Sequence, residues 1–128
     1  MNILLDTCTF LWMVDDVSKL GPEARVELED ASNRVILHQA SCWEIQIKYS
    51  LGKLPLARPP REIIRDGIQM HGIEYHNLQD EAIWHLEKLP PLHGDPFDRI
   101  LVAHALCEGL KLATPDPIIA NYPVPIVW

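Results

Sequence analysis

Apolar residues along the chain fall into two patterns, short continuous runs and longer stretches with helical spacing. The short runs predict strands at residues 2–5, 34–38, 72–76, 111–114 and 124–127. The longer stretches, in which apolar positions recur every three or four residues, predict helices at residues 7–15, 22–32, 41–51, 60–70, 79–88 and 96–109. Because strands and helices alternate, the sequence predicts an α/β fold built on a mainly parallel sheet.

The helix expected at residues 96–109 differs from the others because it is apolar nearly all round. Only Arg99, His104 and Glu108 interrupt its apolar surface. A helix of this composition is buried on more than one side. We therefore expect it to lie between the sheet and a partner subunit.

Length and composition predict one soluble domain that spans residues 1–128, of which 48% are hydrophobic. No apolar run approaches the roughly 20 residues needed to cross a bilayer, so we expect no membrane partner. The N-terminal segment has no basic residues and carries Asp6, which is unlike a signal peptide and indicates a cytoplasmic protein. The three cysteines form no Cys-x-x-Cys pair, which predicts buried free thiols and argues against a zinc site.

The formal net charge of −7 limits how the protein could bind nucleic acid. A protein that binds nucleic acid through bulk electrostatics is normally basic. Any nucleic-acid role of this chain must therefore depend on a local site, and the positions of the acidic residues become the main question.

Four acidic residues stand where strands end or helices begin. Asp6 ends the first predicted strand, and Asp116 follows the strand near residue 113. Glu44 and Asp98 lie in the first turns of two predicted helices. Ligands of open parallel sheets bind beyond the carboxyl ends of the strands, so we expect these four carboxylates to share one edge of the sheet.

Each acid taken singly also has a structural explanation. Ser41 and Glu44 have the spacing of a capping box, and Asp95 is a natural N-cap for the helix that follows it. Asp116 could cap a final helical turn, whereas Asp6 has no obvious local partner. Together, however, four carboxylates on one rim repel each other, and a divalent cation removes that repulsion. Carboxylate ligands favour Mg²⁺ or Mn²⁺, which suits phosphodiester hydrolysis.

Four segments in this order resemble one family, the PIN-domain ribonucleases, and within it most closely the VapC toxins of bacterial toxin–antitoxin pairs. The segments are LLDT at residues 4–7, SCWEIQIKYSLGKL at 41–54, HGDPFDRILVAHAL at 93–106 and LATPD at 112–116. The resemblance implies a three-layer α/β/α sandwich with a parallel central sheet. It also implies a metal-dependent endoribonuclease that forms homodimers and is inhibited by a VapB-like antitoxin.

The acids of the family match Asp6, Glu44, Asp98 and Asp116 of this chain. The resemblance implies that these residues are catalytic, bind Mg²⁺ or Mn²⁺ and orient the water that attacks an RNA phosphate. Antitoxins of the family often insert a basic side chain into this site, and an acidic crevice would attract such a segment. Cys8 is a departure, because many relatives have histidine at this position.

Four further residues are candidates for supporting or substrate-binding roles. Asp95 matches an extra acid that is frequent in the subgroup, and Thr114 matches a hydroxyl residue that orients a carboxylate or water. Lys48 could guide RNA to the site or could simply be solvated surface. Arg99 could bind phosphate or could pair with a carboxylate.

Two other functions remain open from the sequence. A degenerate member of the family could keep only its binding contacts. A haloacid-dehalogenase-like phosphatase also places an aspartate after the first strand, but it needs a second aspartate at position 8, where this chain has Cys8. The six histidines lack the His-x-x-x-His spacing of zinc hydrolases.

Overall fold

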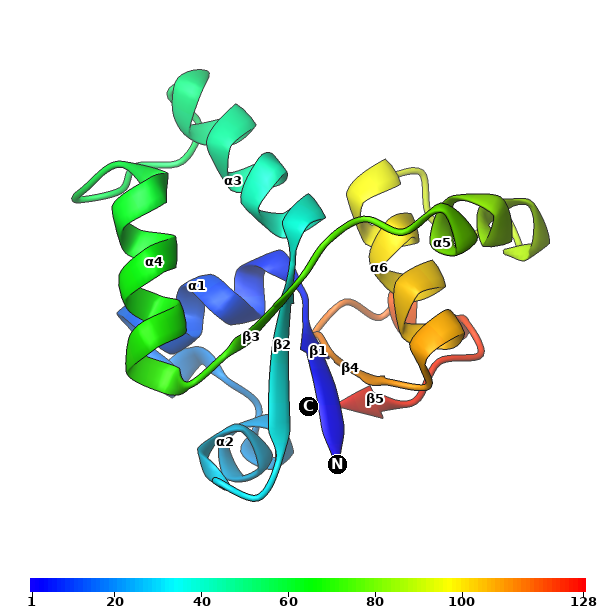
Figure 1. Cartoon of the computed structure of the whole chain (residues 1–128), viewed down its shortest axis with the longest axis horizontal. Helices are drawn as coiled ribbons and strands as arrows, with labels where there is room; N and C mark the ends of the chain where they lie inside the picture. The colour runs from blue at the N-terminus through cyan, green and yellow to red at the C-terminus, as the bar shows by residue number, and fades with distance from the viewer.

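A five-stranded parallel sheet forms the centre of the computed structural model, which describes residues 1–128 (Figure 1). The strand order is β3-β2-β1-β4-β5, and every neighbouring pair is parallel. The strands are β1 Asn2–Leu5, β2 Arg34–His38, β3 Glu74–His76, β4 Lys111–Ala113 and β5 Ile126–Val127. The predicted α/β class is confirmed, and the sheet contains no antiparallel pair.

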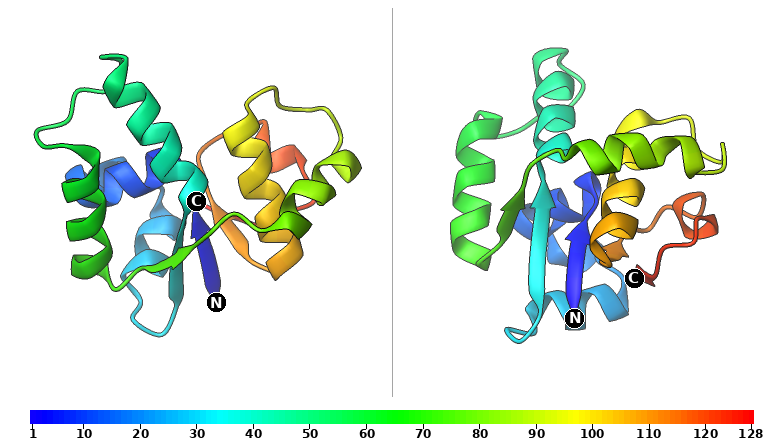
Figure 2. Two further views of the ribbon diagram at one scale, coloured as in Figure 1. Left: turned by 45° about the horizontal axis from the view of Figure 1, so that its top comes forward. Right: turned by 45° about the vertical axis from the view of Figure 1, so that its right-hand side comes forward.

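Helices cover both faces of this sheet. They are α1 Thr7–Asp15, α2 Pro22–Glu29, α3 Gln39–Ser50, α4 Pro60–His71, α5 Asp80–His85 and α6 Pro96–Glu108. Short 3₁₀ turns are η1 Val17–Lys19, η2 Leu86–Lys88 and η3 Ile119–Asn121. Helices α1 and α4 lie on one side of the sheet and α5 and α6 on the other, while α3 projects beyond the carboxyl end of β2 (Figures 1 and 2).

Two hydrophobic clusters hold the layers together because successive strand side chains point to opposite faces. Leu4 of β1 packs in the cluster with α6, whereas Ile3 and Leu5 pack in the cluster with α1. All three are fully buried. The fold is therefore the three-layer α/β/α sandwich that the sequence resemblance implied.

Helix α6 is buried as its composition predicted, but the expectation that a partner subunit covers its outer face was wrong. Residues 100–105 are all buried, and the apolar ones among them share a cluster with Ala82 of α5 and with Tyr122 and Val124 of the C-terminal segment. This chain itself covers the outer face of α6. A partner subunit is not needed to explain the apolar pattern.

The local chemistry of the helix ends explains where the elements differ from prediction. Helix α3 begins at Gln39 rather than Ser41, because the Nδ1 atom of His38 accepts the backbone N–H of Ala40 and caps the helix. Ser41 therefore lies inside α3, and the capping box that its spacing with Glu44 suggested is absent. No helix of the protein is long and apolar enough to span a membrane.

Candidate metal centre

The topology of the sheet creates a natural ligand site at the carboxyl ends of β1 and β4. From β1 the chain continues to β2 and β3 on one side and later returns to β4 and β5 on the other. Such a switch in strand order opens a crevice beyond the central strands. Asp6 directly follows β1, and Asp116 follows β4 by three residues, so the predicted convergence of strand exits is observed.

Asp98 and Asp116 meet at this edge around the imidazole of His93. The Nε2 atom of His93 lies 2.9 Å from Oδ2 of Asp116 and 3.2 Å from Oδ2 of Asp98. One ligand atom from each of the three residues lies within 4.8 Å of the others. The three side chains come from the loop before α6, the first turn of α6 and the loop after β4.

The electrostatics of the site are concentrated on Asp98. Burial, followed by the negative charges of Asp95, Glu44 and Asp6, raises the pKa of Asp98 to about 7, although His93 opposes the shift. Burial also raises the pKa of Asp116, but hydrogen bonds from His93 and from backbone N–H groups outweigh it, so that this pKa is lowered overall. Of the predicted acids, Asp6 and Glu44 therefore lie close enough to raise the pKa of Asp98, and Asp116 meets Asp98 at His93.

Asp6 has local partners that the sequence did not suggest. Its Oδ1 atom accepts the backbone N–H of Thr9 at 2.8 Å and caps α1, and its Oδ2 atom accepts the hydroxyl of Thr114. Cys8 also donates its thiol to Asp6. The expectation that Asp6 has no local partner was wrong, and burial still raises its pKa above the ordinary value.

Glu44 is buried and held by two side chains, one from α1 and one from α3. The hydroxyl of Thr7 donates to Oε1 of Glu44 at 2.6 Å and lies 3.1 Å from the hydroxyl of Ser41. Lys48 donates its ammonium to the other carboxylate oxygen of Glu44. Lys48 is thus an ion-pair partner of a site acid, with half of its side chain exposed.

Asp95 and Thr114 both contact the backbone next to the acids. Asp95 caps α6 by accepting the backbone N–H groups of Phe97 and Asp98, which confirms the capping interpretation. The hydroxyl of Thr114 accepts the backbone N–H of Asp116 while it donates to Asp6. Thr114 therefore links the two strand exits through one hydroxyl group.

Arg99 does not pair with a carboxylate. Its guanidinium donates to the carbonyl oxygens of Leu86 and Pro90 and to the hydroxyl of Tyr122. Three neutral oxygens occupy the guanidinium, so the alternative of a carboxylate pair is wrong. Arg99 braces the loop that leads into α6.

His93 and Tyr122 are the site residues that sequence reasoning missed. His93 lies inside the motif-bearing stretch and two positions before the N-cap Asp95, which could have drawn attention to it. Tyr122 is almost fully buried, and its hydroxyl accepts the backbone N–H of His93 at 2.9 Å. No local pattern in the sequence indicates that contact.

The donor set fits a hard divalent cation. Asp98 and Asp116 offer carboxylate oxygens at one point, and the raised pKa of Asp98 shows that the unneutralised cluster disfavours its own ionisation. A divalent cation relieves this repulsion, and oxygen ligands suit Mg²⁺ and Mn²⁺. No cysteine takes part, since burial and the charge of Asp6 raise the pKa of Cys8 to about 12.

Comparison with known proteins identifies the fold family. The family model described as "PIN domain" matches residues 3–125. The chain belongs to the PIN domain family. A curated member, Ribonuclease VapC16 of Mycobacterium tuberculosis, is 40% identical over 50 residues, which is 39% of this chain and 36% of that protein. The match therefore spans about a third of the relative's length.

Solved structures of other PIN-like chains share the architecture at low sequence identity. The structure of VapBC2 from Rickettsia felis bound to a promoter DNA fragment has a TM-score of 0.74 at 15% identity, covering 98% of this chain and 97% of that chain. VapBC-1 from nontypeable Haemophilus influenzae has a TM-score of 0.57 at 18% identity, covering 98% and 96%. FitAB bound to a DNA fragment has a TM-score of 0.59 at 17% identity, covering 97% and 92%. These similarities show the PIN fold.

Proposed function

We propose that this PIN-domain protein is a metal-dependent endoribonuclease and the toxin of a toxin–antitoxin pair. The observation that carries the proposal is the meeting of Asp98 and Asp116 at one point, beside Asp6 and Glu44, at the carboxyl edge of the sheet. Family membership and the partial match to a protein named as a ribonuclease support RNA as the substrate.

The four acids would hold Mg²⁺ or Mn²⁺, which activates water for attack on a phosphodiester and stabilises the leaving oxygen. Within the chain, Thr114 orients the carboxylate of Asp6, and Thr7 orients that of Glu44. Asp98 contributes a further carboxylate, whose pKa burial and the neighbouring acids raise as long as no cation neutralises them. Lys48 keeps the charge of Glu44 partly balanced at the rim.

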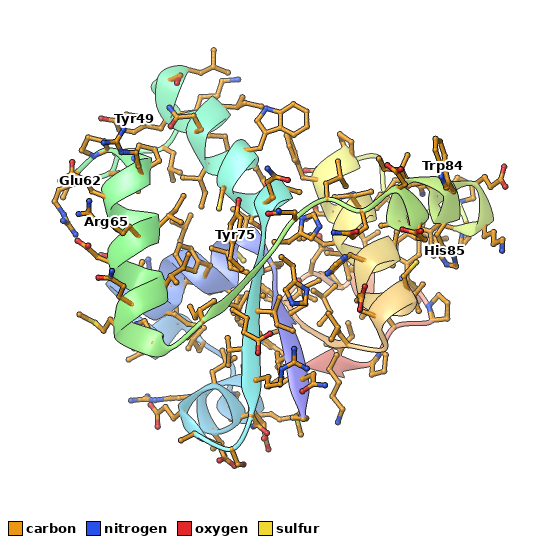
Figure 3. The ribbon with its side chains drawn as sticks, viewed as in Figure 1. Tyr49, Glu62, Arg65, Tyr75, Trp84 and His85 are labelled. Carbon is orange, nitrogen blue, oxygen red and sulfur yellow. The ribbon has the colours of Figure 1, made fainter.

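Protein partners are supported by exposed apolar surface next to the site. Trp43 is 61% exposed and packs edge-to-face on Phe97, with ring centroids 5.3 Å apart. Both rings line a groove of about 460 Å³ between α3 and α6, which Leu78 and Leu86 on either side of α5 complete. Trp84 on α5 is also exposed and projects away from the body of the protein (Figure 3). Exposed aromatic surface of this kind marks protein-binding sites.

We assign two partners to this surface and the acidic site, a VapB-like antitoxin and a second copy of the chain. VapBC and FitAB complexes among the structural neighbours support the antitoxin. A basic segment of the antitoxin would enter the acidic crevice, so salt should slow its association. An association rate that is unaffected by salt would refute the electrostatic part, and light scattering of the purified protein tests the homodimer.

The deciding experiment is cleavage of a structured RNA pool by the purified protein with Mg²⁺ or Mn²⁺. The Asp6→Asn variant is the site variant, because asparagine can still cap α1. The Glu23→Gln variant is the matched control, because it removes an exposed carboxylate on α2, at the opposite end of the sheet (Figure 1). Activity should disappear with EDTA and in Asp6→Asn but persist in Glu23→Gln.

Other outcomes identify the two competing functions. Hydrolysis of a phosphomonoester without RNA cleavage would indicate a phosphatase. No cleavage of either substrate, combined with retained antitoxin binding, would indicate a degenerate PIN domain that acts only by binding.

A further inference from the structure

His93 can take one of two roles next to the acids. Its side chain is 15% exposed, and its Nε2 atom contacts Asp98 and Asp116 together. A histidine in this place either binds the metal through the lone pair of Nε2 or donates an Nε2–H hydrogen bond to the carboxylates. The two roles require opposite tautomers of the neutral ring.

The other ring nitrogen decides between these tautomers. The backbone N–H of Asp95 points to Nδ1 of His93, with a nitrogen–nitrogen distance of 3.1 Å. A backbone N–H can only donate, so Nδ1 must present its lone pair and carries no proton. The proton of the neutral ring is then on Nε2, which faces the two carboxylate oxygens.

We propose that His93 is a positioning residue of the metal centre and not one of its ligands. The inference rests on the proposed metal-dependent function. Its Nε2–H donates to Asp116 at 2.9 Å and reaches Asp98 at 3.2 Å, which orients their oxygens. Hydrogen bonds from a surrounding group to ligating carboxylates commonly control metal affinity. The donor set remains all oxygen, which favours Mg²⁺ and Mn²⁺ over softer metals.

A buried brace fixes the ring in this orientation. The hydroxyl of Tyr122 accepts the backbone N–H of His93 at 2.9 Å and a guanidinium N–H of Arg99 at 3.1 Å. Arg99 also holds the carbonyl oxygens of Leu86 and Pro90 on the same loop. Tyr122 and Arg99 therefore hold the backbone of His93 in place, and its ring cannot turn without losing the Asp95 contact.

The first test reads the tautomer directly by nitrogen NMR of the isotope-labelled imidazole. We expect the proton on Nε2 of His93 in EDTA, and we expect it to stay there when Mg²⁺ is added. A proton on Nδ1, either in EDTA or after Mg²⁺ is added, overturns the inference. If Mg²⁺ still binds to the protein, the proposed function is left intact. An absence of any Mg²⁺ or Mn²⁺ binding overturns the proposed function, and the inference with it.

The second test compares two variants by Mn²⁺ titration, monitored by electron paramagnetic resonance. His93→Gln keeps an N–H donor, whereas His93→Leu removes it at similar size. A positioning role predicts about tenfold weaker Mn²⁺ binding in His93→Leu, a loss of about threefold or less in His93→Gln, and no nitrogen hyperfine coupling in the wild-type protein. Nitrogen coupling that disappears in both variants, or equal affinity in all three proteins, would overturn it. If His93→Leu does not fold, the wild-type NMR measurement still decides.

Discussion

Replacing Asp98 by asparagine should stabilise the metal-free protein. Asp98 is buried among acids, and its pKa is raised to about 7 from the ordinary value of 3.8. The folded protein therefore holds a proton that the unfolded chain releases, and folding becomes less favourable as the pH rises through this range. Asparagine keeps the size of the side chain but removes the charge.

The expected magnitude follows from the shift in pKa. At pH 8 the raised pKa costs about 4 kcal/mol of folding free energy, and at pH 5 about 2 kcal/mol, because part of the penalty develops only between these values. Solvent screens this effect little, since the side chain is 18% exposed. Asp98→Asn should therefore gain about 4 kcal/mol at pH 8 and about half as much at pH 5.

Urea unfolding in EDTA, followed by circular dichroism at both pH values, measures the gain. Asp116→Asn is a control of opposite sign, because the pKa of Asp116 is lowered and its carboxylate accepts hydrogen bonds from His93 and Ile118. That variant should lose stability at pH 8. The reasoning is refuted if Asp98→Asn is no more stable than the wild type at pH 8, or if its gain is the same at both pH values.

Three further predictions concern sites outside the acid cluster. Burial, with help from neighbouring histidines, lowers the pKa of His38 to about 4 from 6.5, so protonation of His38 should cost about 3 kcal/mol of folding free energy as the pH drops through this interval. His38→Asn, which can still cap α3, should remove this cost, so that urea unfolding shows the variant gaining about 3 kcal/mol on the wild type between pH 6.5 and pH 4. Gly67→Ala should lower stability by about 1–3 kcal/mol despite the better helix propensity of alanine, because its methyl group would lie 2.7 Å from a side-chain carbon of α1. A methyl group at Gly94 would meet nothing within 4 Å, so Gly94→Ala should leave thermal unfolding nearly unchanged. Iodoacetamide at pH 8 should alkylate the exposed Cys107 well before Cys8, because the pKa of Cys8 is raised to about 12. Mass spectrometry of digests measures the two labelling rates, and equal labelling would contradict the assigned burial.

The layers of the fold were predictable because the apolar runs are long enough to identify every strand, even where the lengths differ. The expected strand at 124–127 is reduced to Ile126–Val127, and the expected helix at 79–88 tightens to a 3₁₀ turn after His85. The start of α3 was missed because a histidine side chain replaces the usual hydroxyl or carboxylate cap. The ends of helices and strands depend on such single hydrogen bonds, which the periodicity of apolar residues does not predict.

The positions of Asp6 and Asp116 were predictable because they follow from topology. A residue that ends a strand of a parallel sheet lies at the same edge as other strand exits, whatever its side chain does. The position of His93 follows from its backbone hydrogen bond to Tyr122, 29 residues away along the chain, and from the bond of Arg99 to the same hydroxyl. Neither contact leaves a local signature in the sequence.

The capping role of Asp6, beside its proposed place in the metal site, affects how the sequences of relatives should be interpreted. Asp6 caps α1 and accepts a hydrogen bond from Thr114, so natural selection for folding alone would still favour a capping side chain, aspartate or asparagine, at this position after activity was lost. Asp98 lowers the stability of the metal-free chain, so drift without functional selection would remove it first. An intact Asp98, rather than an intact Asp6, is therefore the better indicator that a related gene still encodes a working site.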